Sequence, residues 1–149
     1  MTPSQLQHSQ LLKMRNARRL AWTELARGFA KLGLSAQRIT DETHERIVDA
    51  FRKLDPVTRL VRDDLWLDQA RRLAENEFSI MVGDPWEIDA HPIARVAGPA
   101  LVESLGALAD LFPSGFYLSG PSASRFLIVN FDEDTDCGEM LAECAALGL

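Results

Sequence analysis

Cysteine is scarce in this chain, and its scarcity limits where the protein can work. Cys137 and Cys144 are the only two among 149 residues. On a helix, seven positions separate two Cα atoms by about 10 Å, whereas a disulfide needs less than about 7 Å. We therefore expect two free thiols and a reducing compartment, the cytoplasm.

Long apolar runs are also missing. No stretch of 18 apolar residues occurs, and residues 1–10 are polar. A membrane-spanning helix needs roughly 20 apolar residues, and a secretory signal has an apolar stretch near the N-terminus. The sequence therefore predicts a protein with no membrane span and no signal peptide.

The common catalytic and cofactor motifs are absent. The chain has no Gly-x-Ser-x-Gly elbow, phosphate-binding loop or dinucleotide fingerprint. No histidine stands at metal-ligand spacing from a cysteine. We expect no cofactor and no metal. An enzyme is possible only if its groups converge from distant segments, and the candidate nucleophile Cys137 has acids beside it that oppose a lowered thiol pKa.

The composition is that of one globular domain covering residues 1–149. Hydrophobic residues make up 46% and charged residues 26% of the chain, both ordinary values. A chain of this length buries roughly 68–70% of its unfolded surface. It can therefore fold without a disulfide or a metal.

Apolar residues recur with a helical period in five segments. The first is ended by Gly33, and Thr40 or Asp41 can cap the second. The third changes its apolar side near Asp63, which indicates either a break or a helix buried on two faces. The fourth is the most hydrophobic and is predicted to be a central helix. The five segments are about 4–33, 41–54, 57–76, 92–112 and a last helix from Asp136.

Three segments are predicted to be strands, near 77–82, 115–119 and 124–131. The first alternates apolar and polar residues, and turn residues join the other two into a hairpin. We expect an α+β domain, rich in helix, with a small antiparallel sheet of about three strands. A sheet of that size has an open edge, so we also expect a homodimer, through that edge or through the central helix.

Charge is unevenly distributed along the chain. Residues 1–38 carry seven basic residues and one acid, whereas residues 80–149 carry two basic residues and eleven acids, within a net charge of −6. The basic segment could bind nucleic acid, with Arg15, Arg18 and Arg19 as contacts. The other cations of its helix lie on nearly the opposite side. We therefore favour docking of this helix onto the protein's own acidic half.

Two residues fall unexpectedly on apolar helix faces. Arg18 lies in the apolar arc of the first helix, where it either extends its charged end to the surface or pairs with a carboxylate or an anion. His44 lies near Ile47 and Phe51 and is predicted to be a partly buried structural residue.

The acidic run 132–136 is the main candidate interaction site. Its acids partly match a calcium loop, but Cys137 stands where that loop needs glycine. The acids are better explained by the dipole of a helix that begins there. We expect Asp132, Glu133 and Asp134 to contact a partner, together with Trp86, although a tryptophan in the core is the commoner case.

These features predict a small acidic protein that binds another protein with a basic surface. Inhibitors, immunity or anti-defence factors and adaptors belong to this class. The alternatives are a nucleic-acid-associated regulator that uses the first helix and an enzyme with an unrecognised site.

Overall fold

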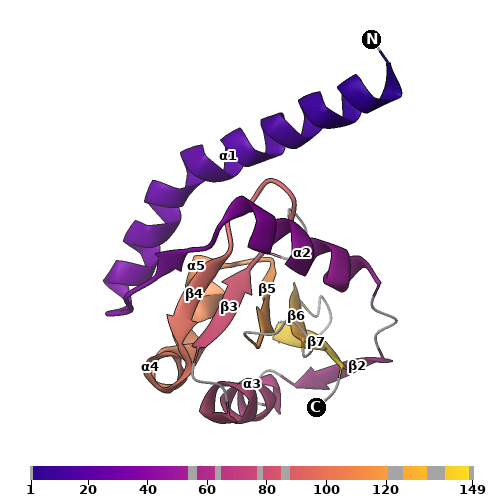
Figure 1. Ribbon diagram of the computed structural model, residues 1–149. Helices are drawn as coiled ribbons and strands as arrows, with labels where there is room; N and C mark the ends of the chain where they lie inside the picture. Colours follow the sequence, from indigo (N-terminus) through magenta and orange to yellow (C-terminus); the bar gives the residue numbers. More distant parts are fainter. Residues whose placement is uncertain are drawn as a thin grey trace.

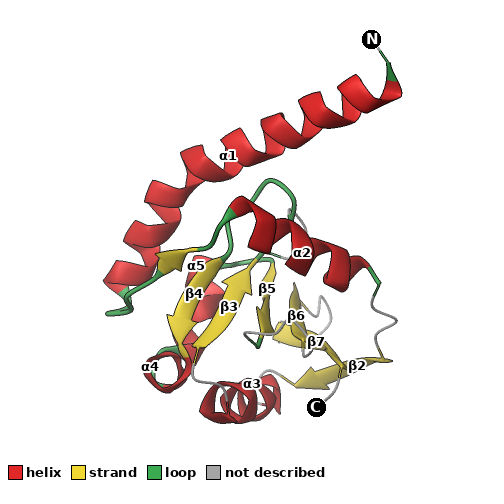
Figure 2. Ribbon diagram, viewed as in Figure 1, coloured by secondary structure: helices red, strands yellow, loops and turns green. Residues whose placement is uncertain are grey.

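The computed structural model describes residues 2–53, 57–62, 65–76, 79–84, 88–120, 126–133 and 140–147. They form an α+β domain in which helices lie against a single antiparallel sheet, as the sequence predicts (Figures 1 and 2). The helices are α1 (Pro3–Lys31), α2 (Asp41–Arg52), α3 (Leu65–Asn76), α4 (Gly98–Val102), the 3-10 helix η1 (Leu105–Ala107) and α5 (Leu108–Leu111). The strands are β1 (Gln37–Arg38), β2 (Val57–Arg62), β3 (Ser79–Gly83), β4 (Ala94–Ala97), β5 (Gly115–Ser119), β6 (Phe126–Glu133) and β7 (Met140–Leu147).

The sheet has seven strands in the order β1-β4-β3-β5-β6-β7-β2. The three strands predicted from the sequence are present, and they are consecutive in its centre as β3, β5 and β6. The predicted strand number of about three was too low, because β4, β7 and β2 lie in segments that were predicted to be helical. Of the described strands, β1 and β2 lie at the two edges.

The predicted central helix over 92–112 is wrong. The segment begins with β4, in which Ala94 and Val96 are buried while Arg95 is exposed. Only short helical turns follow, α4, η1 and α5. β4 pairs with both β3 and β1, so its conformation is decided by neighbouring strands and not by its alanine-rich composition.

The predicted last helix is also wrong where the structure describes it. Met140–Leu147 forms β7, which pairs along its whole length with β6 and along six residues with β2. Asp136, the predicted start, lies outside the described residues, as does Cys137. The helical spacing argument for Cys137 and Cys144 therefore no longer holds, because Cys144 is in a strand.

The change of apolar side near Asp63 marks a real change of element. Val57–Arg62 is the edge strand β2, and Leu65–Asn76 is the helix α3. The break was therefore predicted at the right place, but a strand and not a helix precedes it. Val57, Thr58 and Val61 are β-branched, which favours a strand.

The two faces of the sheet carry separate cores. On one face, Phe116, Leu118 and Leu127 pack with Phe29 of α1 and Leu73 of α3. On the other, the aromatic rings of Tyr117 and Phe126 pack with Ile47 and Val48 of α2. The alternation of Phe116, Tyr117 and Leu118 between the two cores is the two-residue period of a strand.

The first helix is much longer than the part that packs on the domain. Its 29 residues correspond to about 43 Å. A capping box between Thr2 and Gln5 begins it, and Gly33, with φ of 75°, ends it. Its C-terminal half lies against the domain, while its N-terminal half extends past the sheet (Figure 1).

None of the described helices is both long enough and apolar enough to cross a membrane.

Candidate functional site

A charge cluster joins α1, α2 and the segment 88–92. At its centre is Arg18, which is only 2% exposed. Its Nη2 lies 3.0 Å from Oδ1 of Asp41 and 3.2 Å from Oε2 of Glu45, and its Nη1 donates to the carbonyl oxygen of Asp89 at 2.9 Å. Of the two alternatives for Arg18, the structure therefore shows the carboxylate pair.

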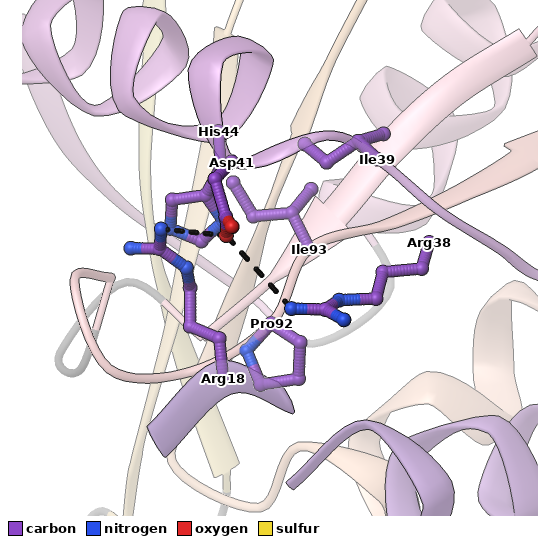
Figure 3. A pocket seen from close by; sticks show the side chains of 7 residues that line it. All are labelled: Arg18, Arg38, Ile39, Asp41, His44, Pro92 and Ile93. Atoms are coloured by element: carbon purple, nitrogen blue, oxygen red, sulfur yellow. Dashed lines mark hydrogen bonds and ion pairs between the residues drawn. The ribbon is translucent and has the colours of Figure 1, made fainter. Parts of the chain in front are cut away.

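Further arginines surround the same carboxylates. Arg15 binds Glu45 with two hydrogen bonds, from Nε at 3.0 Å and from Nη2 at 2.6 Å. Arg38 lies 3.8 Å from Asp41, and Figure 3 shows Asp41 between Arg18 and Arg38. The hydrogen bond from Arg15 is the main reason that the pKa of Glu45 lies below its usual value, and Glu45 in turn raises the pKa of Arg15.

His44 is a structural residue, as predicted, and it is fully buried where partial burial was expected. Its Nε2 lies 2.7 Å from the carbonyl oxygen of Ile88, and since a carbonyl only accepts, this nitrogen carries the proton. The pKa of His44 is lowered to about 4, mainly by burial; the hydrogen bond to Ile88 opposes this shift, and the charge of Arg18 adds to it. His44 is therefore neutral at pH 7.

The cluster stabilises the helix packing and does not have the features of an active site. The cleft between its side chains has no room for the centre of a water molecule. None of its lining side chains is a serine, threonine, cysteine or lysine, and a histidine with a pKa near 4 is a weak general base at neutral pH. The cleft is lined by Arg18, Arg38, Ile39, Asp41, His44, Pro92 and Ile93.

A second, larger hollow lies between the C-terminal half of α1 and α5. We call it the α1–α5 groove; it is open to solvent and has a volume of about 370 Å³. Gly28 lies beneath it, where a Cβ atom would come within 2.3 Å of Cδ1 of Leu111, so this position allows α5 to approach α1 closely. The groove is lined by Glu24, Arg27, Gly28, Lys31, Leu32, Ala107, Asp110 and Leu111.

The predicted acidic contacts are partly described. Asp132 and Glu133 are the last two residues of β6, where they pair in register with Leu141 and Met140 of β7. They therefore lie at the end of the β6–β7 hairpin, and the predicted run continues into its connection. Asp134 and Trp86 lie outside the described residues.

The arginines of the nucleic-acid alternative are not brought to one exposed surface. Arg15 and Arg18 turn toward α2 and pair with its acids. Arg19 is exposed and donates to Asn16 at 2.6 Å on the same helix. The first helix thus docks onto the protein's own acids, but its ion-pair partners lie in α2 and not, as expected, in the acidic half of the chain.

The partners of Arg18 were not identified from the sequence, although a signal for them exists. Asp41 and Glu45 are four residues apart, which places both carboxylates on one side of α2. The described residues contain no group of three or more His, Cys, Asp or Glu side chains that could hold a metal ion.

The chain gives no significant match to known proteins when it is compared with protein-family models, curated proteins and solved structures.

Proposed function

We propose that this protein binds a basic protein partner through the acidic end of its β6–β7 hairpin, as an inhibitor, immunity or anti-defence factor, or adaptor would. The observation that carries the proposal is the set of ion pairs formed by the two α1 arginines that face the domain. Arg15 and Arg18 pair with Asp41 and Glu45 of α2. These two cations are therefore occupied elsewhere and are not the counter-charges of the acidic C-terminal third.

The hairpin is a suitable frame for such a surface. β6 and β7 pair over eight consecutive residues without a bulge in the register, and β5 and β2 flank the pair. Acids held at the end of a paired hairpin lose little conformational freedom on binding. A negative surface also accelerates association with a positive one.

The charge balance of the chain points the same way. Eleven acids and two basic residues fall within residues 80–149. Of these acids, Asp89 pairs with Arg52, and Asp84 also takes part in an interaction within the domain. An excess of one sign on one part of a domain repels itself and is relieved by a partner of the opposite sign.

The test neutralises the acids of the hairpin as a group. A variant with Asp132→Asn, Glu133→Gln and Asp134→Asn is compared with a control carrying Glu42→Gln, Asp49→Asn and Glu75→Gln. The control changes the net charge by the same amount at three exposed positions of α2 and α3. The partner is captured from the native host with the unmodified protein, and its association with each variant is measured at low and at physiological ionic strength.

We expect the hairpin variant to associate about tenfold more slowly at low ionic strength, while the control stays within about twofold of the unmodified protein. Both variants should keep their melting temperature. Equal association rates for the two variants would remove the acidic hairpin from the proposal. The nucleic-acid alternative has less support because Arg15 and Arg18 are already paired. The cleft at Arg18 has no room for a substrate.

A further inference from the structure

We propose that the exposed N-terminal half of α1 docks, antiparallel, along the outer side of α1 in a second copy of this chain, where it covers the α1–α5 groove. The contact is symmetric, so each copy gives its helix end and receives the other. This surface is distinct from the acidic hairpin of the proposed function. It rests on three observations: the exposure of the helix end, the residue pattern along α1, and the position of the groove.

The end of the helix carries apolar side chains that touch little of their own domain. Leu6 is 50% exposed, and Leu20 farther along is 67% exposed. From Pro3 to Leu12 the helix has no charged residue. Removing leucine side chains from water is favourable, so a helix of this kind is stabilised by a covering partner.

Eight positions of α1 form a two-row stripe at heptad spacing, in which Leu6, Ala17 and Leu20 are apolar and four members are charged. Within each row, neighbouring members are seven residues apart. Each member of the second row stands four residues after a member of the first, which is the spacing of the two core positions of a heptad. The stripe lies about 130° around the helix from the buried Arg18, Leu25 and Phe29. All its members are exposed except Ala17, which is half-buried. The first row is Leu6, Lys13, Leu20 and Arg27, and the second is Gln10, Ala17, Glu24 and Lys31.

An antiparallel pair of these stripes is complementary to itself. When Ala17 lies opposite Leu20 of the second copy, a small side chain faces a large one at the centre of the contact. In the same register, Lys13 lies opposite Glu24 of the second copy, and by symmetry each of these contacts occurs twice. Opposite charges at facing positions select such a register.

The charged side chains that this register brings together form no ion pair within the part of the chain that the structure describes. Lys13, Glu24, Arg27 and Lys31 are absent from every ion pair there. A parallel pair would instead place Lys13 against Lys13 and Arg27 against Arg27. Like charges at facing positions are destabilising, so the antiparallel arrangement is the favoured one.

The same register brings the exposed helix end to the groove. Leu6 of the second copy lies opposite Lys31, and Gln10 of the second copy lies opposite Arg27. Lys31 and Arg27 both line the α1–α5 groove, whose remaining wall includes the apolar Ala107 and Leu111. The groove, of about 370 Å³, is thus next to the uncharged leucine-bearing segment of the second helix, and each copy covers the groove of the other.

The test is a charge exchange, read as the dissociation constant of the dimer by sedimentation of the full chain over a concentration series. Lys13→Glu places two acids opposite each other, and Glu24→Lys places two cations opposite each other. Within one helix, positions 13 and 24 are about 16 Å apart, so they cannot compensate each other in a monomer. Arg19→Glu is the matched control, since Arg19 is an exposed cation of α1 outside the stripe.

We expect each single reversal to weaken the dimer about tenfold or more, and the double variant Lys13→Glu/Glu24→Lys to restore it to within about threefold. Arg19→Glu should leave it within about threefold, and Leu20→Glu should abolish it. A strict monomer at the highest concentration overturns the proposal, and so does a dimer that Leu20→Glu leaves intact. A dimer weakened by both single reversals but not restored by the double variant overturns the antiparallel register.

Discussion

Arg18 of α1 and Asp41 of α2 form a contact between a buried guanidinium and a carboxylate that is still partly in water. Nη2 and Oδ1 are 3.0 Å apart, and the exposed fractions of the two side chains are 3% and 31%. Glu45 and the carbonyl oxygen of Asp89 complete the surroundings of the guanidinium. The cluster therefore holds three separate segments together. We expect substitution of its acids and substitution of Arg18 to change stability by different amounts.

Removing the acids should cost more than removing the arginine. Asp41→Asn with Glu45→Gln leaves a buried cation without a charged partner, which costs about 3–5 kcal/mol of unfolding free energy. Arg18→Met leaves two carboxylates that keep water, Arg15 and Arg38 as neighbours, and we expect a smaller loss of about 2 kcal/mol. Denaturant unfolding of both variants measures the difference. Arg52→Gln, which removes an exposed pair with Asp89, is the control and should cost less than about 1 kcal/mol.

Stability should fall as the pH is lowered, because of His44. Its pKa is about 4 in the folded protein, against 6.5 for an unperturbed histidine. Between pH 6.5 and pH 4, the unfolded chain binds a proton that the folded protein does not. The unfolding free energy therefore decreases with decreasing pH, by at most about 1.4 kcal/mol per pH unit from this group. Above pH 6.5 and below pH 4, the protonation of His44 no longer changes the unfolding free energy with pH.

The measurement is the unfolding free energy across this pH range for the unmodified protein and for His44→Gln, which keeps a donor for the carbonyl oxygen of Ile88. The slope should flatten in the variant. Glu45, whose pKa is lowered by Arg15, acts in the same direction at lower pH and should remain in both proteins. An unchanged slope in His44→Gln would contradict the assignment.

Replacing Tyr117 by phenylalanine should stabilise the protein. The Tyr117 hydroxyl is the one fully buried side-chain polar atom without a hydrogen-bond partner among the described residues, and burial raises its pKa well above the usual value. A buried unpaired hydroxyl costs about 1–3 kcal/mol. The ring contacts with Phe51 at 5.3 Å and Phe126 at 6.2 Å do not involve the hydroxyl.

We expect Tyr117→Phe to raise the unfolding free energy by about 1 kcal/mol, measured by denaturant or thermal unfolding. Tyr117→Leu is the packing control and should lower it, since the aromatic contacts are lost. A loss of stability in Tyr117→Phe would show that the hydroxyl has a partner beyond the described residues.

The elements predicted correctly are those that local signals specify. Thr40 accepts a hydrogen bond from the backbone N–H of Thr43 and caps α2, and Gly33 ends α1 with a positive φ. The apolar run Phe126–Val129 belongs to β6, which lies between two other strands. Each of these signals acts within a few residues of the chain, so no knowledge of the rest of the fold is needed.

The elements predicted wrongly depend on distant pairing. The sequence of β7, from Met140 to Leu147, is rich in alanine and leucine, which favour helix, yet both of its edges pair with other strands. The hydrogen bonds of a strand between two neighbours outweigh a weak local preference. The position of Arg18 in the apolar arc of α1 could be recognised from the sequence. Its pairing with Asp41 and Glu45 depends on how α1 packs on α2, which is a contact between distant segments.

Shortening α1 should separate the stability of one domain from the effect of association. The segment 1–12 adds little to the domain, since Leu6 and Leu12 are about half exposed. At dilute concentration, deletion of residues 1–12 should therefore change the unfolding free energy by less than about 1 kcal/mol. If α1 pairs with a second copy, the melting temperature of the full chain rises with protein concentration, because association stabilises the folded state. The shortened chain has lost Leu6 and Gln10, so its melting temperature should stay constant over the same concentration series. A large loss of stability at dilute concentration would instead show that the helix end packs on its own domain.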